Sequence, residues 1–204
     1  MRVVSTRDVP LEVLNDLKTE LGDDFALEIG DRVTLLSAEP PSWITLISES
    51  NWWVNVLAAY VAVYVAAIVK EAGKDTWKNR GKALAVLRPS SDKIKKLATA
   101  VARALSRLQP NTRAIVGTPI PNEVYSTQLS LTPGDENDLA VEIAMFVYFL
   151  PALTDLLKTE GFGSGKTSGW VGLKLLHDGS LEVKWFDRHS LIEVCRIIPF
   201  DHAP

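Results

Sequence analysis

The feature that most constrains the fold is a run of nineteen residues without charge, from Asn51 to Val69. As a helix, this run is at the threshold of length for crossing a bilayer. Three polar side chains stand inside it, namely Asn55, Tyr60 and Tyr64. A helix that is apolar all round is either a core helix or a membrane span. We therefore expect a long apolar helix near 52–79, buried in the core, with a membrane helix over 52–69 as the alternative.

The rest of the chain predicts a globular protein of mixed secondary structure. Its 204 residues are 47% hydrophobic and 23% charged, which is enough apolar surface for a core and argues against disorder. Helical and strand periodicities alternate without regular βαβ spacing. The predicted class is α+β, with mostly antiparallel sheet or sheets built from hairpins and covered by about four helices. We expect a single domain over 1–204, with two lobes of about 1–110 and 111–204 as the alternative.

Turn residues between alternating segments predict three hairpins. The turns centre on Gly30-Asp31, on the Pro-rich stretch at 118–122, and on Asp178-Gly179. The segments that we expect to pair are 25–29 with 33–36, 112–117 with 123–131, and 170–176 with 180–186. The apolar run 191–198 predicts a last strand.

Apolar stripes predict the helices on either side of these hairpins. Leucines at helical spacing indicate a helix over 10–21, which Gly22 would stop. A second stripe, made of Leu139, Ile143, Phe146 and Leu150, begins after the acidic stretch 135–138. We expect this second helix to lie across the sheet formed by its neighbouring hairpins.

Charge is distributed in blocks along the chain. Residues 1–69 have a net charge of −6, residues 70–113 of +9 and residues 114–204 of −6. The basic block either lies against the acidic flanks within one molecule or faces a partner. Much of it belongs to a predicted amphipathic helix, 91–108. The candidate interaction surface is the basic stripe of that helix, made of Lys93, Lys96, Arg103 and Arg107.

No catalytic, cofactor-binding or metal-binding residue is assigned from the sequence, and we expect no cofactor. Residues 165–167 match the end of a P-loop, but Glu160 stands where that motif requires glycine. Cys195 with His177 or His189 could form a thiol nucleophile and its base. The apolar run around Cys195 instead predicts a buried, inert thiol. Three histidines and one cysteine show no zinc-ligand spacing.

The predicted partners follow from the basic helix. It has no aromatic residue and the chain is acidic overall, which argues against nucleic acid as a partner. An apolar face beside a basic face favours an anionic membrane surface as one alternative. A single cysteine and an N-terminal stretch without an apolar signal core predict a cytoplasmic protein, with membrane association as the alternative.

The sequence resembles no family that we recognise. Its composition favours a non-enzymatic protein-interaction module that binds an unknown protein partner or itself, as small acidic α+β proteins that neutralise a toxin domain do. Two alternatives remain open. The first is a membrane-associated protein, anchored by the 52–69 helix or by the basic helix 91–108. The second is an enzyme whose residues form no recognisable motif.

Overall fold

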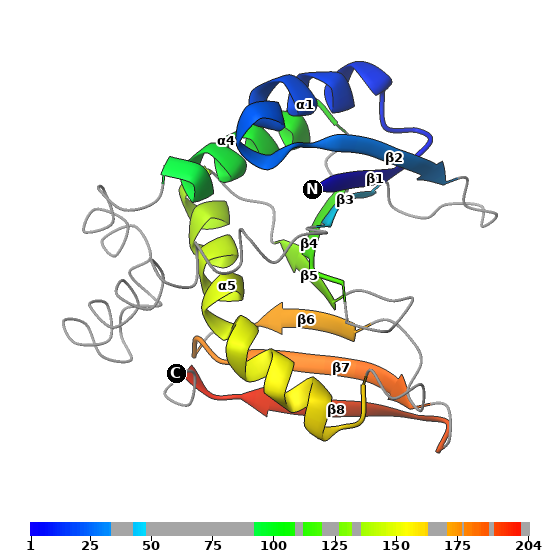
Figure 1. Ribbon diagram of the computed structural model, residues 1–204, viewed down its shortest axis with the longest axis vertical. Helices are drawn as coiled ribbons and strands as arrows, with labels where there is room; N and C mark the ends of the chain where they lie inside the picture. Colours follow the sequence, from blue (N-terminus) through cyan, green and yellow to red (C-terminus); the bar gives the residue numbers. More distant parts are fainter. Residues whose placement is uncertain are drawn as a thin grey trace.

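The fold is known from a computed structural model that describes residues 1–33, 43–47, 92–108, 112–119, 127–131, 136–162, 171–176, 178–187 and 190–200. These residues form one eight-stranded sheet and three helices (Figure 1). The strands are β1 (Arg2–Thr6), β2 (Glu28–Val33), β3 (Trp43–Ile47), β4 (Arg113–Gly117), β5 (Thr127–Leu131), β6 (Val171–Leu175), β7 (Leu181–Asp187) and β8 (Ile192–Ile198). The helices are α1 (Leu11–Phe25), α4 (Asp92–Ser106) and α5 (Glu136–Thr159).

The sheet is mixed, in the order β2-β1-β3-β4-β5-β6-β7-β8. The pairs β1/β2, β3/β4 and β5/β6 are parallel, and the other four pairs are antiparallel. The α+β class is thus confirmed, but the expected predominance of antiparallel hairpins is only partly met. The reason lies in the connections: each parallel pair is joined through a helix, α1, α4 or α5, and such a crossover returns the chain in the same direction.

The number of helices also differs from the prediction. Three helices are described where about four were expected, and the long apolar helix predicted near 52–79 lies outside the described residues. Among the described helices, α5 is the long apolar one. Its segment Asp138–Thr159 is long and apolar enough to span a membrane by length and composition alone. This is weak support for a membrane span, because a core helix passes the same test.

The predicted hairpin about Gly30-Asp31 is wrong, because β2 runs straight through both residues. Gly30 leaves room for a close approach of a side chain rather than for a turn. A Cβ atom at Gly30 would lie 2.3 Å from Nε of Arg2 on the neighbouring strand. Asp31 accepts a hydrogen bond from the same arginine at 2.9 Å. Both residues therefore accommodate Arg2 on the edge of the sheet.

The first helix also ends later than predicted. Gly22 lies inside α1, which continues to Phe25, and Ala26 takes the left-handed conformation with φ of 45°. Burial explains the extra turn, since Phe25 continues the stripe of Leu14, Leu17 and Leu21 into the core. Ala26 bears a modest conformational cost so that Leu27 can also be buried.

The strand pairings of the two later predicted hairpins are confirmed, while residues 120–126, which include most of the predicted turn 118–122 and the start of the predicted strand 123–131, lie outside the described residues. β4 pairs with β5, and β6 pairs with β7 around Asp178-Gly179. Gly179 has a φ of 84°, and the Asp178 carboxylate accepts a hydrogen bond from the backbone N–H of Ser180 at 3.0 Å. Such a turn needs a residue that tolerates positive φ, which the Asp-Gly pair provides. β8 then adds antiparallel to β7, as the last strand of the sheet.

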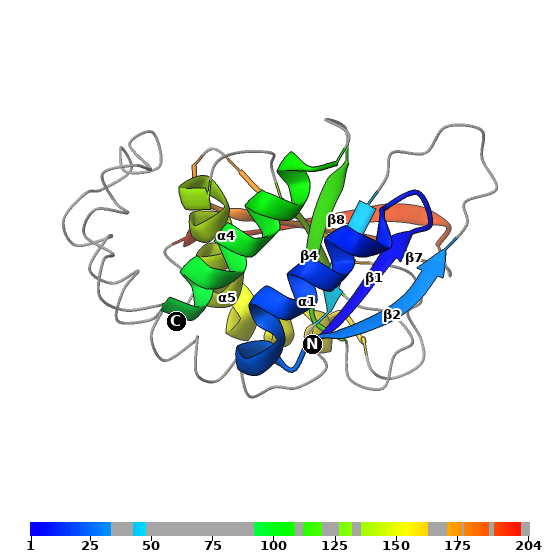
Figure 2. The same cartoon turned by 90° about the horizontal axis from the view of Figure 1, so that it is seen from above.

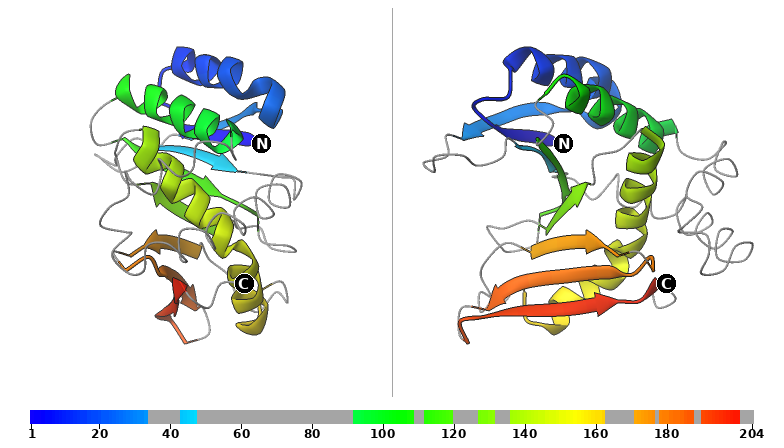
Figure 3. Two further views of the ribbon diagram at one scale, coloured as in Figure 1. Left: turned by 90° about the vertical axis from the view of Figure 1, so that its left-hand side faces the viewer. Right: turned by 180° about the vertical axis from the view of Figure 1, so that it is seen from behind.

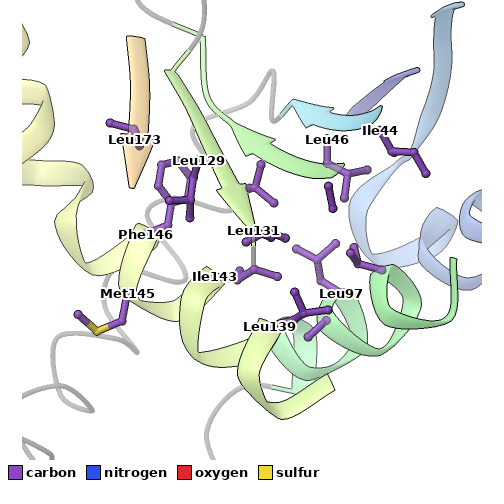
Figure 4. Packing of buried hydrophobic residues seen from close by; sticks show 14 of the residues in the cluster. Ile44, Leu46, Leu97, Leu129, Leu131, Leu139, Ile143, Met145, Phe146 and Leu173 are labelled. Carbon is purple, nitrogen blue, oxygen red and sulfur yellow. The ribbon is translucent and has the colours of Figure 1, made fainter. Parts of the chain in front are cut away.

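The described helices cover one face of the sheet. Helices α1 and α4 lie side by side (Figure 2), and α5 crosses the second half of the sheet, as predicted (Figure 3). Their apolar stripes meet alternate residues of the strands in one continuous core. Figure 4 shows Ile143 and Phe146 of α5 beside Leu129 and Leu131 of β5, with Leu97 of α4 close by.

The sheet is continuous across the boundary of the two lobes considered above. β3 pairs with β4 along its whole length, from Trp43 beside Arg113 to Ile47 beside Gly117. Whether the chain behaves as one domain or as two lobes stays a prediction.

Candidate interaction surfaces

The basic stripe of α4 faces acidic side chains of α1. Arg103 forms an ion pair with Glu20 at 3.2 Å. Arg107, one turn later, forms one with Glu12 at 3.0 Å and another with Asp16. The three acids are spaced by four residues and so lie on one side of α1. The hydrogen bond to Asp16 raises the pKa of the Arg107 guanidinium above its ordinary value, and the charge of Glu12 adds to this effect.

These ion pairs bridge a groove of about 380 Å³ between the two helices. Small and aliphatic side chains line it beneath the charges: Val13, Leu17, Ala100 and Ala104. Arg103 and Arg107 are therefore turned toward acids of the same chain. Of the other two predicted surface residues, Lys96 is exposed, and Lys93 lies in the first turn of α4 with a side chain outside the description.

A second surface lies at the other end of the sheet, on the β7–β8 hairpin. Five large apolar side chains are exposed in the described part of the chain, and four of them gather here. They are Phe186, Leu191, Ile192 and Ile197, with exposed fractions of 43%, 71%, 57% and 48%. The fifth is Leu11, on α1. Apolar side chains that gather on a surface mark sites of interaction more often than isolated ones do.

The register of β7 and β8 divides these residues between the two faces of the sheet. Ile192 lies opposite Asp187 in the row of β8 that continues through Val194, Arg196 and Ile198, on the α5 side. Ile197 lies opposite Glu182, on the face away from the helices, together with Cys195 and Glu193. Both faces of β8 thus present an exposed isoleucine, while no described strand pairs with its outer edge.

Arg196 ties β8 to the rest of the fold, and a second ion pair lies on the neighbouring strand β7. On the α5 side, Arg196 forms an ion pair with Glu160 at 2.7 Å, and its guanidinium lies 5.8 Å from the ring centre of Trp185. On the other side, Lys184 forms an ion pair with Glu182 at 3.0 Å, within β7 itself. The hydrogen bond to Glu182 raises the pKa of Lys184 above its ordinary value. The strand is therefore fixed on its inner side and open on its outer side.

The predicted burial of Cys195 is wrong. Its side chain is exposed on the face away from the helices, with the thiol 3.9 Å from a carboxylate oxygen of Glu182. The alternation of β8 explains this, because odd-numbered residues of the strand point away from α5. The proposed bases His177 and His189 lie outside the described residues.

The opposite edge of the sheet has a different character. Among the residues of β2 whose side chains are described, Glu28 and Asp31 are exposed and no large apolar side chain is. Arg32 donates hydrogen bonds from Nη2 to the carbonyls of Arg7 and Val9, at 2.6 and 2.5 Å, and so fastens β2 to the loop before α1. Charges on an edge strand discourage pairing with another chain. β8 also exposes two charges, Glu193 and Arg196, but it is the edge with exposed isoleucines and is therefore the better suited of the two to receive a further strand.

Other kinds of site find little support in the described residues. No group of three potential ligands among His, Cys, Asp and Glu is placed to hold a metal ion there. The segment that contains residues 165–167 falls outside the description.

Sequence reasoning overlooked the β8 surface because a run such as LIEVCRII is apolar in both alternating rows, which is typical of a strand buried on both faces. The only warning was one charge in each row, Glu193 and Arg196.

Comparisons with known proteins add no identification, since no family model, no curated protein and no solved structure gives a significant match to this chain.

Proposed function

We propose that this chain is a non-enzymatic protein-interaction module whose binding surface is the outer edge of β8 with its exposed apolar side chains. The observation that carries the proposal is the exposure of Ile192 and Ile197 on the two faces of β8, a strand whose outer edge no described strand covers. Two further exposed apolar side chains stand next to it, Phe186 on β7 and Leu191 in the turn before β8. Adding a strand to an open sheet edge is a common mode of protein recognition.

The composition of β8 supports this role. The strand is seven residues long and contains no proline or lysine, the residues that usually protect an edge against other chains. Main-chain hydrogen bonds would supply affinity, and Ile192 and Ile197 would rest against a partner on opposite faces of the sheet. Neutralisation of a toxin domain is a narrower form of the same proposal, which at present rests on composition alone.

The membrane alternative is less well supported by the described residues. The apolar side of α4 is buried against its neighbours, with Leu97 and Val101 at 0% and 3% exposure, and so cannot enter a bilayer while the fold is intact. Two of the four basic residues are engaged with α1. The 52–69 helix lies outside the description. We therefore give precedence to the protein-binding role.

The proposal is tested by placing a photo-crosslinking amino acid at Ile192 or Ile197 in cells that make the protein. Leu11 is the matched control, because it is an exposed large apolar residue distant from β8 in the fold. We expect a discrete protein adduct from the β8 positions and none from position 11. The partner protein identified in the adduct is then purified, and its binding to the chain without the crosslinking residue is measured by titration.

Ile192→Lys and Ile197→Lys should then weaken binding at least tenfold, whereas Leu11→Lys should leave it unchanged. Both β8 variants are expected to fold, since the new lysines would face Asp187 and Glu182 on the neighbouring strand. Equal adducts from Leu11 and from β8, or binding insensitive to both β8 variants, would refute the assigned surface.

A further inference from the structure

A free antiparallel edge strand can pair with a copy of itself about a two-fold axis. The symmetry places one residue opposite its own counterpart, and residues at equal distances on either side of it face each other. Facing residues in an antiparallel pair lie on the same side of the sheet. For β8, the choice of the central residue therefore determines every contact across the seam, and four central positions, 193 to 196, would use most of the strand.

Charge excludes two of these registers. Centring on Glu193 or on Arg196 would place each residue opposite its own counterpart, and like charges directly opposite each other destabilise a sheet. Centring on Cys195 would place Glu193 opposite Ile197 of the second copy. Because Ile197 already has Glu182 on its inner side, two carboxylates would then flank one isoleucine. Each of these three registers brings like charges together.

Centring on Val194 brings no like charges together. Arg196 would face Ile192 of the second copy, whose inner neighbour is Asp187, a residue of opposite charge. Ile197 would lie beside the turn of the second copy that holds Leu191, so that two exposed apolar side chains come near each other at each end of the seam. Glu193 would face Cys195 of the second copy, whose inner neighbour is Lys184. The carboxylate of Glu193 and the ammonium group of Lys184, which have opposite charges, would then lie on either side of the small thiol of Cys195. The two-fold axis makes each contact twice.

We infer that a second copy of this chain occupies the β8 edge, antiparallel and centred on Val194, which joins the two eight-stranded sheets into one. This inference rests on the proposed function, because it names the partner of the same surface. It assigns distinct roles to three residues: Val194 lies on the axis, Ile197 lies beside the turn that holds Leu191, and Glu193 is separated from the oppositely charged Lys184 by Cys195.

The first test is the mass of the full-length chain in solution, measured by size-exclusion chromatography with light scattering over a concentration series. We expect 45 kDa, which is twice the 22.5 kDa of one chain. Glu193→Lys should reduce the mass to 22.5 kDa at the same concentrations, because it turns the attraction to Lys184 into repulsion. The matched reversal Glu28→Lys on the opposite edge should leave the mass at 45 kDa. A wild-type chain that is monomeric throughout would overturn the inference.

The second test fixes the register and does not depend on Glu193. Under mild oxidation, Val194→Cys in a Cys195→Ser background should form a covalent dimer, since the two new thiols would face each other. Native Cys195 should crosslink at least tenfold more slowly, because it would face Glu193. Faster crosslinking of native Cys195 would overturn the assigned register, and the absence of crosslinking in both proteins would overturn the pairing of β8 with itself.

The two proposals fail in distinguishable ways. A monomeric chain whose position 192 still crosslinks to a different protein would refute the second copy and leave the protein-binding surface intact. A monomeric chain with no adduct from positions 192 and 197 would refute both proposals.

Discussion

Glycines show at the scale of single residues how conformation and space decide the effect of a substitution. Gly22 is inside α1, and nothing lies within 4 Å of the position that its Cβ would occupy. Gly22→Ala should therefore stabilise the protein by about 0.5–1 kcal/mol, the difference in helix propensity. Urea unfolding measures the change. A loss of stability would indicate that Gly22 ends the helix, as the sequence had predicted.

Gly179 is the opposite case. Its φ of 84° is accessible to glycine at no cost, while the nearest side-chain atom to a Cβ there, on Phe200, is 3.8 Å away. Gly179→Ala should cost about 1–2 kcal/mol through backbone strain alone, since space is available. The same urea titration tests it, and the Gly22→Ala variant serves as its control. If Gly179→Ala changed the free energy of unfolding as Gly22→Ala does, or raised it, the role of glycine in the Asp178-Gly179 turn would be contradicted.

At the scale of secondary-structure elements, packing rather than charge should hold α4 in the fold. Leu97 is fully buried, and Leu97→Ala should cost about 2–5 kcal/mol because it leaves a cavity.

The ion pairs of Arg107 are exposed to solvent. Arg107→Gln should lower the thermal midpoint only slightly at low salt, because exposed ion pairs contribute little. In about 1 M salt it should have no effect, because the Debye screening length is then only about 3 Å. Thermal unfolding at the two salt concentrations separates the contributions, and an effect of Arg107→Gln that persists at high salt would contradict the prediction.

The elements themselves were predictable where the local pattern was decisive. Alternation in β6 and β7, the Asp178-Gly179 turn and the stripe from Leu139 to Leu150 predicted their elements correctly. Parallel pairing was not predictable in the same way, because it depends on which strands the crossover helices bring together. The exposure of β8 was equally hidden, since the run LIEVCRII looks the same at an edge as in the middle of a sheet. Of the four predicted surface residues, sequence reasoning could place Arg103 and Arg107 on one stripe but not opposite Glu20 and Glu12 of α1.

At the scale of the whole molecule, the pairing of β3 with β4 predicts cooperative unfolding. This parallel pair connects the first half of the sheet to the second, and buried Val116 of β4 lies within it. Because neither half of the sheet is complete without the other, the full chain should unfold in one transition. Far-UV circular dichroism and tryptophan fluorescence should give the same midpoint in urea.

Val116→Ala tests whether that transition belongs to the entire sheet. The substitution should cost roughly 1–3 kcal/mol, as expected for truncating a buried aliphatic side chain. In a single cooperative domain, hydrogen exchange at the backbone amides of β1 and β7 would accelerate by the same factor, although β7 lies far from Val116 in the strand order. Two lobes would respond differently: the amides near β4 would lose protection while those of β7 kept it. Equal acceleration would make the seam between β3 and β4 an internal part of one domain, and the only open edges of its described sheet would then be β2, protected by charge, and β8.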